Sequence, residues 1–145
     1  MESLLISACL LGVDCKYSGG NNALPAEPLA RLKERYRLIP VCPETAGGLP
    51  IPREPSERVP GKVIGRSGRD VTEEFNRGGD TALSLTERFG CKKALLKEHS
   101  PSCGSGSIYD GTFSNALIPG DGVAAEKLKA AGVEVFGESR IIELL

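Results

Sequence analysis

Short apolar runs alternate with amphipathic segments along the chain, and this alternation constrains the fold more than any other feature. Four runs have the length and aliphatic content of buried strands, at residues 4–8, 36–41, 94–97 and 133–136. Helices are predicted between them, at 25–35, 72–89 and 123–131. Strands that alternate with helices form crossover units. The sequence therefore predicts an α/β fold of the Rossmann-like, three-layer kind, with a mainly parallel sheet and helices on both faces.

The length predicts a single domain. A chain of 145 residues, 40% of them hydrophobic, is expected to form one unit over 1–145 and to bury roughly two-thirds of its surface. The section 47–70 is rich in Gly, Pro and Arg and is predicted to be a long functional loop or a small hairpin. The turn signal Tyr-Asp-Gly-Thr at 109–112 predicts a small hairpin after the loop that carries Cys103.

Charge and hydropathy narrow the classes of partner. Eighteen basic and nineteen acidic residues leave a formal net charge of -1, so no overall field favours nucleic acid or an anionic membrane. The N-terminal apolar run is interrupted by Ser7 and follows an acidic residue. It is too short for a membrane span, which needs ~20 apolar residues, and it lacks the basic start of a signal peptide. We expect a cytoplasmic protein with no nucleic-acid or membrane partner.

The cysteines are the main candidates for chemistry, because five is an odd number for a disulfide framework and cytosolic thiols stay reduced. Cys9 and Cys42 directly follow the first two predicted strands, and Cys103 lies in the loop after the third. Loops after parallel strands meet at one edge of the sheet, so these three thiols are expected to converge. Cys91 precedes its strand and is expected at the opposite edge, as a packed or half-exposed thiol.

Three converging thiols have several interpretations. They suit three irons of a four-iron, four-sulfur cluster whose fourth iron stays open. A structural zinc module is a second interpretation, although close pairs such as C-x-x-C are absent. Cys9 and Cys15 would also suit a thiol-redox protein, as nucleophile and resolving thiol. Cys15 is otherwise a fourth ligand or a bystander, and three unrelated cysteines near loops remain the plainest alternative.

Five segments occur in the same order as in the thiouracil desulfurase family and together resemble it: SACLLG (7–12), VCPETAGGLPIPREP (41–55), GRDVTEEFNRGG (68–79), LLKEHSPSCG (95–104) and IYDGTFSN (108–115). The resemblance implies an oxygen-sensitive 4Fe-4S cluster with one iron not ligated by protein. It also implies non-redox removal of sulfur from a thiolated base or nucleoside of the 2-thiouracil or 4-thiouracil type. Matched motif by motif, the implied cluster ligands are Cys9, Cys42 and Cys103.

Three other residues are candidates for catalysis. Glu44, two residues after Cys42, is the candidate to take a proton from water and return it to the ring. As a residue type it also suits a surface position after a proline, and the resemblance favours the catalytic role. Ser100 and Ser102 flank a proline beside Cys103. They are expected either to hydrogen-bond substrate or cluster sulfur, or to satisfy the turn.

Some residues near these motifs are interpreted differently. His99 is the only histidine and has no assigned carboxylate partner, so it is left out of the predicted site. Arg53 is expected either to anchor the substrate or to brace its loop by pairing with Glu54 or Glu57, and bracing is preferred. The segment 16–19 reads Lys-Tyr-Ser-Gly where relatives read like Arg-Tyr-Asp-Gly, which leaves the preferred thiolated substrate open.

Overall fold

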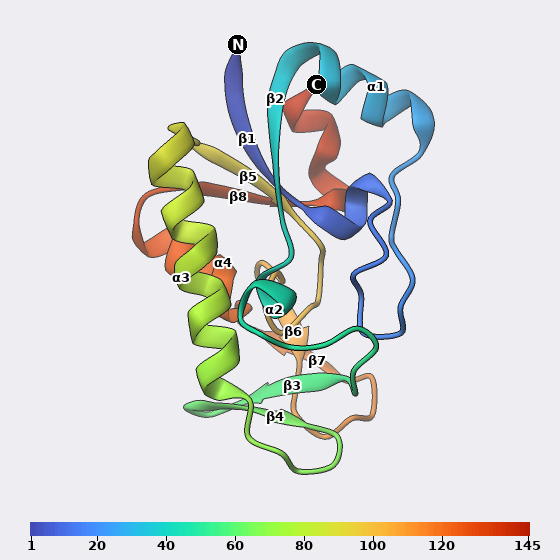
Figure 1. The fold of residues 1–145 in the computed structure, drawn as a ribbon, viewed down its shortest axis with the longest axis vertical. Coiled ribbons are helices and arrows are strands. Elements are labelled where there is room, and N and C mark those ends of the chain that lie inside the picture. Colours follow the sequence, from blue (N-terminus) through green and yellow to red (C-terminus); the bar gives the residue numbers. More distant parts are fainter.

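The computed structural model describes residues 1–145 and has a parallel central sheet. Its four strands lie in the order β2-β1-β5-β8 (Figure 1). Their bounds are Glu2–Ser7 for β1, Tyr36–Val41 for β2, Lys93–Leu96 for β5 and Glu134–Gly137 for β8. Each neighbouring pair is parallel. These are the four strands predicted from the sequence, shifted slightly at their ends, so the expected α/β sheet is confirmed.

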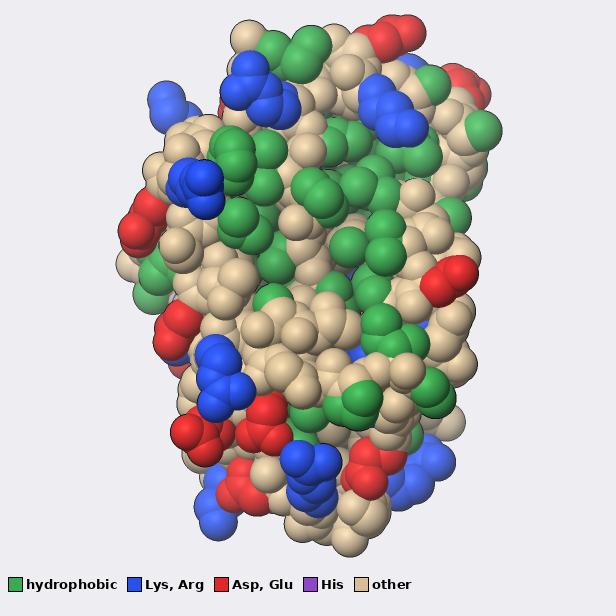
Figure 2. Space-filling view, viewed as in Figure 1, with side chains coloured by type: hydrophobic (Ala, Val, Ile, Leu, Met, Phe, Trp, Pro, Cys, Tyr) green, Lys and Arg blue, Asp and Glu red, His purple; other side chains and the backbone are tan.

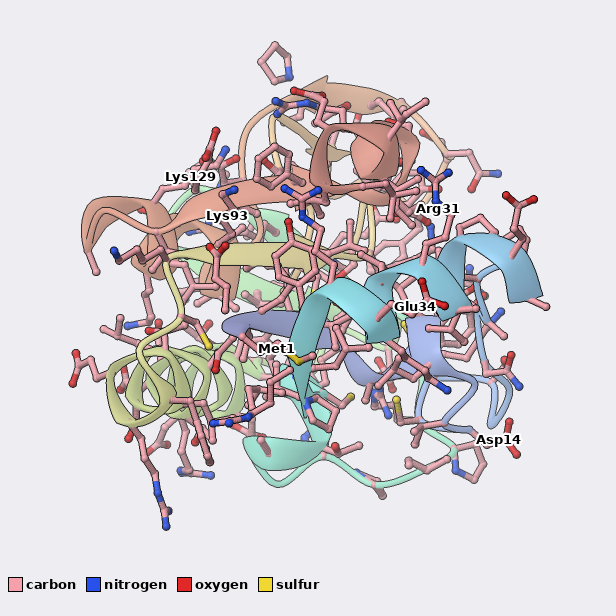
Figure 3. The ribbon with its side chains drawn as sticks, turned by 90° about the horizontal axis from the view of Figure 1, so that it is seen from above. Met1, Asp14, Arg31, Glu34, Lys93 and Lys129 are labelled. Atoms are coloured by element: carbon pink, nitrogen blue, oxygen red, sulfur yellow. The ribbon has the colours of Figure 1, made fainter.

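Helices cover both faces of this sheet. One face carries the helix α1 (Ala26–Arg35) and two 3-10 helices, η1 (Ala8–Leu11) and η2 (Glu138–Leu144). The other face carries α3 (Thr72–Phe89) and α4 (Val123–Ala130). Figure 3 shows Arg31 and Glu34 of α1 on the opposite side of the molecule from α3. The three-layer arrangement predicted from the sequence is therefore confirmed.

The period of the strands explains how two cores form. Successive side chains of a strand point to opposite faces of a sheet. Leu4 of β1 accordingly packs in a cluster that contains Leu32 of α1. Leu5, the next residue, packs in a separate cluster that contains Ala82 of α3 and Leu128 of α4. All five side chains are fully buried. Because the apolar residues of β1 do not alternate with polar ones, this strand packs against helices on both faces of the sheet.

A one-turn helix follows β2 directly and is held against α3. This helix, α2 (Pro43–Ala46), begins with a proline, whose fixed backbone angle suits a first helical turn. A Cβ atom on Gly78 of α3 would overlap the carbonyl of Pro43, and one on Gly47 would overlap the carbonyl of Glu74. Only glycine permits this approach of the two backbones. The start of α2 is therefore positioned by backbone packing.

Two hairpins lie beyond the end of the sheet. One pairs β3 (Ser56–Val59) with β4 (Lys62–Gly65), and the other pairs β6 (Ser107–Tyr109) with β7 (Leu117–Pro119). The section 47–70 therefore contains the small hairpin that its composition suggested. The hairpin after the Cys103 loop is also confirmed, but its connection runs over 110–116 and is longer than the predicted turn.

The connections between strands run in opposite directions across the two halves of the sheet, on either side of the boundary between β1 and β5. The connection from β1 leads to β2 on one side, and the connection from β5 leads to β8 on the other side. In open α/β sheets such a switch point leaves a crevice at the carboxyl ends of the strands, where ligands bind. At the end of the molecule that carries β3 and β4, acidic and basic side chains are interspersed (Figure 2). None of the helices combines the length and apolar character that crossing a membrane requires.

Candidate active site

A cavity of about 350 Å³ occupies the switch point between β1 and β5. Its walls come from the segments that follow three parallel strands, and these segments bring Cys9 and Cys15 after β1, Cys42 after β2, and Cys103 after β5. The structure thus brings the three predicted ligands together around one space. Cys15 lines the same cavity, and its role stays a prediction.

Cys91 lies elsewhere, as its position before β5 predicted. It is absent from the cavity and packs in the apolar cluster between the sheet, α3 and α4. The residue is only 6% exposed, and burial alone raises the pKa of its thiol. No polar side chain hydrogen-bonds to it. It therefore has the surroundings of a structural thiol.

Of the cavity cysteines, Cys9, Cys15 and Cys103 are also buried and Cys42 is half-buried, but polar groups contact the thiols of Cys9 and Cys103. Burial raises the pKa of Cys103 to about 12, while hydrogen bonds from the side chains of Ser7 and Ser102 act in the opposite direction. Burial also raises the pKa of Cys9, and a hydrogen bond from the Asn22 side chain opposes that effect. These donors favour the thiolate, which is the form that binds metals. Metal binding at these cysteines would release protons.

The donor set fits an iron-sulfur cluster better than the other expectations. All five cysteines are free, and thiolates are the usual ligands of such clusters. No three Cys, His, Asp or Glu side chains stand close enough together to hold a single metal ion, which disfavours the zinc module. The thiols instead surround a cavity, as a larger group requires. Burial raises the pKa of Cys9, the thiol expected to be the redox nucleophile, whereas a redox nucleophile needs a lowered one.

Glu44 lies on α2 and reaches across the cavity wall to the Cys103 loop. Its Oε2 accepts a hydrogen bond from the Ser102 hydroxyl at 2.8 Å. The same hydroxyl lies 3.7 Å from the sulfur of Cys103. The other carboxylate oxygen of Glu44, Oε1, accepts a hydrogen bond from Nε of Arg53 at 3.0 Å. Glu44 is therefore no free surface residue, because both carboxylate oxygens are engaged beside the thiols.

Ser100 shapes the loop that carries Cys103. Its hydroxyl oxygen accepts hydrogen bonds from the backbone N–H groups of Ser102 and Cys103, at 3.1 and 2.8 Å. It also lies 3.0 Å from the Ser102 hydroxyl. The turn-satisfying role expected for these serines thus falls mainly to Ser100. Ser102 is the one whose hydroxyl faces Glu44 and Cys103.

Arg53 contradicts its expected pairing. It forms an ion pair with Glu44 rather than with Glu54 or Glu57. Glu54 instead accepts hydrogen bonds from Ser67, and Glu57 accepts hydrogen bonds from backbone N–H groups of the 110–116 connection. The prediction was wrong because it considered neighbours in sequence. The packing of α2 on α3 places the carboxylate of Glu44 beside Arg53.

Sequence reasoning missed two aromatic residues of the cavity wall. His99 and Tyr109 both line it, and their ring centroids lie 6.1 Å apart with an interplanar angle of 65°. Neither side chain makes a hydrogen bond within the protein. His99 also has a backbone φ of 68°, which is uncommon for a non-glycine residue. The sequence signal that could have indicated His99 was its position in the loop that also carries Cys103.

Buried thiols and a paired carboxylate at the switch point of a parallel sheet define a class of protein. It is a single α/β unit whose loop thiols and carboxylate line one cavity at the carboxyl ends of its parallel strands. Within that class, the chain belongs to the 2-thiouracil desulfurase family, whose sequence model matches residues 4–140. The resemblance of the five motifs to this family is thereby confirmed.

Two relatives resemble the chain over almost its whole length. An uncharacterized protein of Bacillus subtilis (strain 168), YbbK, is 39% identical over 152 residues, which cover 98% of this chain and 99% of the relative. The solved structure of the 4Fe-4S-dependent thiouracil desulfidase TudS superposes with a TM-score of 0.95 at 44% identity. That match covers 99% of this chain and 95% of the desulfidase.

Proposed function

We propose that this chain is an iron-sulfur-dependent thiouracil desulfidase. The observation that carries the proposal is the convergence of three loop cysteines with Glu44 on one cavity. This convergence occurs in a chain that is 44% identical to TudS and has nearly the same fold. The net reaction exchanges sulfur for oxygen. Water adds to the ring carbon of a thiolated pyrimidine, the carbon–sulfur bond breaks, and uracil and hydrogen sulfide form without any net oxidation or reduction.

Cys9, Cys42 and Cys103 would hold a 4Fe-4S cluster. Three thiolates serve three of its irons, so one iron has no protein ligand in this proposal. When bound, the cluster supplies a Lewis-acidic iron that polarises the thiocarbonyl group of the substrate. The protein supplies the remaining requirements. It excludes bulk water from the buried thiols and places acid–base groups beside the reacting carbon.

Glu44 is the proposed general base and acid. Its Oε2 faces the Ser102 hydroxyl and, through that hydroxyl, the sulfur of Cys103. A water molecule beside this oxygen would lose its proton to the carboxylate as it attacks the ring carbon. Glu44 then returns a proton to the product. Ser102 can donate to the attacking oxygen or to the substrate, while Ser100 holds the loop in place.

The substrate proposed for this cavity is a small molecule. His99 and Tyr109 offer ring surfaces and free polar atoms on its wall, which suits a flat pyrimidine with hydrogen-bonding edges. The nearly balanced charge of the chain gives no general attraction to a phosphate backbone. We therefore propose a free thiolated base or nucleoside, rather than thiolated tRNA, as the substrate.

Purification without oxygen tests the proposal. Iron, acid-labile sulfide and zinc are measured first, and the loaded protein is then given 2-thiouracil or 4-thiouracil while uracil and sulfide are quantified. The expected result is about four irons and four sulfides per chain, with equimolar uracil and sulfide produced and little conversion of thiolated tRNA. A zinc-loaded protein, or a cluster-loaded protein that makes no uracil from either base, would contradict the proposal.

A further inference from the structure

Arg53 is the most extensively bonded cation of the cavity wall. Its side chain is only 7% exposed. Nε donates to Oε1 of Glu44 at 3.0 Å, Nη2 donates to the carbonyl of Cys15 at 2.9 Å, and Nη1 donates to the carbonyl of Pro50 at 3.2 Å. A guanidinium is planar and rigid, so acceptors on three segments fix its orientation as well as its position.

The carbonyl of Cys15 is a fixed point for this arrangement. It accepts hydrogen bonds both from Arg53 and from the thiol of Cys42, the latter at 3.7 Å. The backbone N–H of Arg53 also donates to the carbonyl of Tyr17. The loop after β1 therefore holds Arg53 at two points, and the guanidinium extends from that loop to Glu44.

The backbone of Glu44 does not depend on Arg53. The contacts of Pro43 with Gly78 and of Gly47 with Glu74 already position α2 on α3. The orientation of the Glu44 carboxylate depends instead on its hydrogen bonds, since the side chain has several staggered rotamers and a broad terminal torsion. Arg53 binds one of its oxygens and leaves the other directed at Ser102.

We infer that Arg53 is a positioning residue that holds the Glu44 carboxylate in the orientation required for attack of water on the ring carbon. This inference rests on the proposed function and adds to it a residue that acts without touching the substrate. Three of its donors are taken by protein acceptors and little of its surface is exposed. The guanidinium has two further N–H donors, so its positioning role rests on the bond to Glu44 and not on a lack of donors.

A double-mutant cycle tests this inference. Wild type, Arg53→Met, Glu44→Gln and the double variant are compared for kcat and KM with 2-thiouracil, each normalised to the cluster content. Arg53→Met keeps a long unbranched side chain without donors. Because a misplaced catalytic group can cost roughly 10²-fold in rate, we expect kcat to fall by about 10- to 100-fold while KM stays within about twofold. In the Glu44→Gln background the same substitution should change kcat by less than about twofold.

The control and the second variant make the result decisive. Arg58→Met removes an ion pair of similar kind, with Glu126, outside the cavity, and should leave kcat unchanged.

If Arg53→Met does not retain its cluster, the cycle is repeated with Arg53→Lys, whose ammonium keeps the charge but cannot serve three acceptors at once. Additive losses in kcat would show that Arg53 acts independently of Glu44 and would overturn the inference alone. Cluster-loaded wild type without any turnover would overturn the proposed function, and the inference with it.

Discussion

The two edges of the central sheet both bury cysteine, yet they differ in what surrounds the sulfur. At the amino edge, Cys91 packs among apolar side chains of the sheet, α3 and α4. At the carboxyl edge, Cys9 and Cys103 are equally buried but receive hydrogen bonds from Asn22, Ser7 and Ser102. Burial alone therefore does not mark a ligand thiol. The polar groups supplied by the end of β1 and by the loops at the switch point distinguish the two edges.

The backbone explains why the polar groups gather at one edge only. Loops after parallel strands converge at the carboxyl edge, and their bends free hydroxyl and amide groups for contacts with a ligand. At the amino edge, Gly90 ends α3 in a left-handed conformation and the chain enters β5 within a few residues. That short connection has few residues that could supply polar groups, so the side chains at this edge mainly pack against one another.

The largest expected effect comes from removing a ligand thiol. Cys9→Ala, Cys42→Ala and Cys103→Ala should each abolish cluster retention and turnover, because each removes one of three proposed protein ligands. Iron content and the visible absorbance of the anaerobic proteins measure the loss. Cys91→Ala is the matched control. It should keep full iron content and turnover while losing about 1 kcal/mol of unfolding free energy in a urea titration, since it removes only a packed sulfur. Loss of iron in Cys91→Ala would contradict the distinction between the edges.

The second effect concerns the chemistry at the carboxyl edge. Glu44→Gln keeps the size of the side chain but cannot accept a proton from water, so turnover should fall by roughly 10²- to 10⁴-fold with the cluster retained. Single-turnover measurements of uracil release, together with iron content, check the result. Glu74→Gln, which disrupts an ion pair with Arg69 outside the cavity, should leave turnover unchanged. Near-normal turnover in Glu44→Gln would assign proton transfer to Ser100, Ser102 or solvent.

A smaller effect is expected at the aromatic wall. Tyr109→Leu removes a ring that faces the cavity, and aromatic contacts of this kind contribute about 0.5–1.5 kcal/mol, so KM for 2-thiouracil should rise about 2- to 10-fold with kcat little changed. His99→Asn should act in the same direction, because asparagine tolerates the positive φ but lacks the ring. Tyr36→Phe, far from the cavity at Leu144, is the control. An unchanged KM in both cavity variants would place the pyrimidine elsewhere.

The smallest effect on turnover is expected at Cys15. Its carbonyl accepts hydrogen bonds from Arg53 and Cys42, and a substitution of the side chain leaves that carbonyl in place while it removes the contact of the Cys15 thiol with Cys42. Cys15→Ala should therefore keep the cluster and most of the activity, as measured by iron content and uracil formation. Loss of the cluster would instead indicate four cysteine ligands and argue against an iron open to the substrate.

The fold was predictable because local pattern and global topology agree. Apolar runs such as 4–8 and 133–136 are too short for helices, and their aliphatic side chains suit a sheet buried on both faces. Cys9 and Cys42 could be placed at one edge because they follow such runs directly. Cys91 could be placed at the other edge because it precedes one. The ordered motifs likewise indicated the family, which the sequence model of that family confirmed.

The sequence alone thus determined where the strands lie along the chain. It also determined the edge of the sheet to which Cys9, Cys42 and Cys91 belong, and the family. Tertiary packing decided which side chains face one another within that edge. Arg53 has two carboxylates close in sequence, yet it pairs with Glu44, because the backbone contact between Pro43 and Gly78 brings α2 to it. His99 lies beside Tyr109 in the cavity wall because a bridge pairs its backbone with Ile108 of β6. Such contacts depend on distances of a few ångströms between distant segments, which no local pattern of residues encodes.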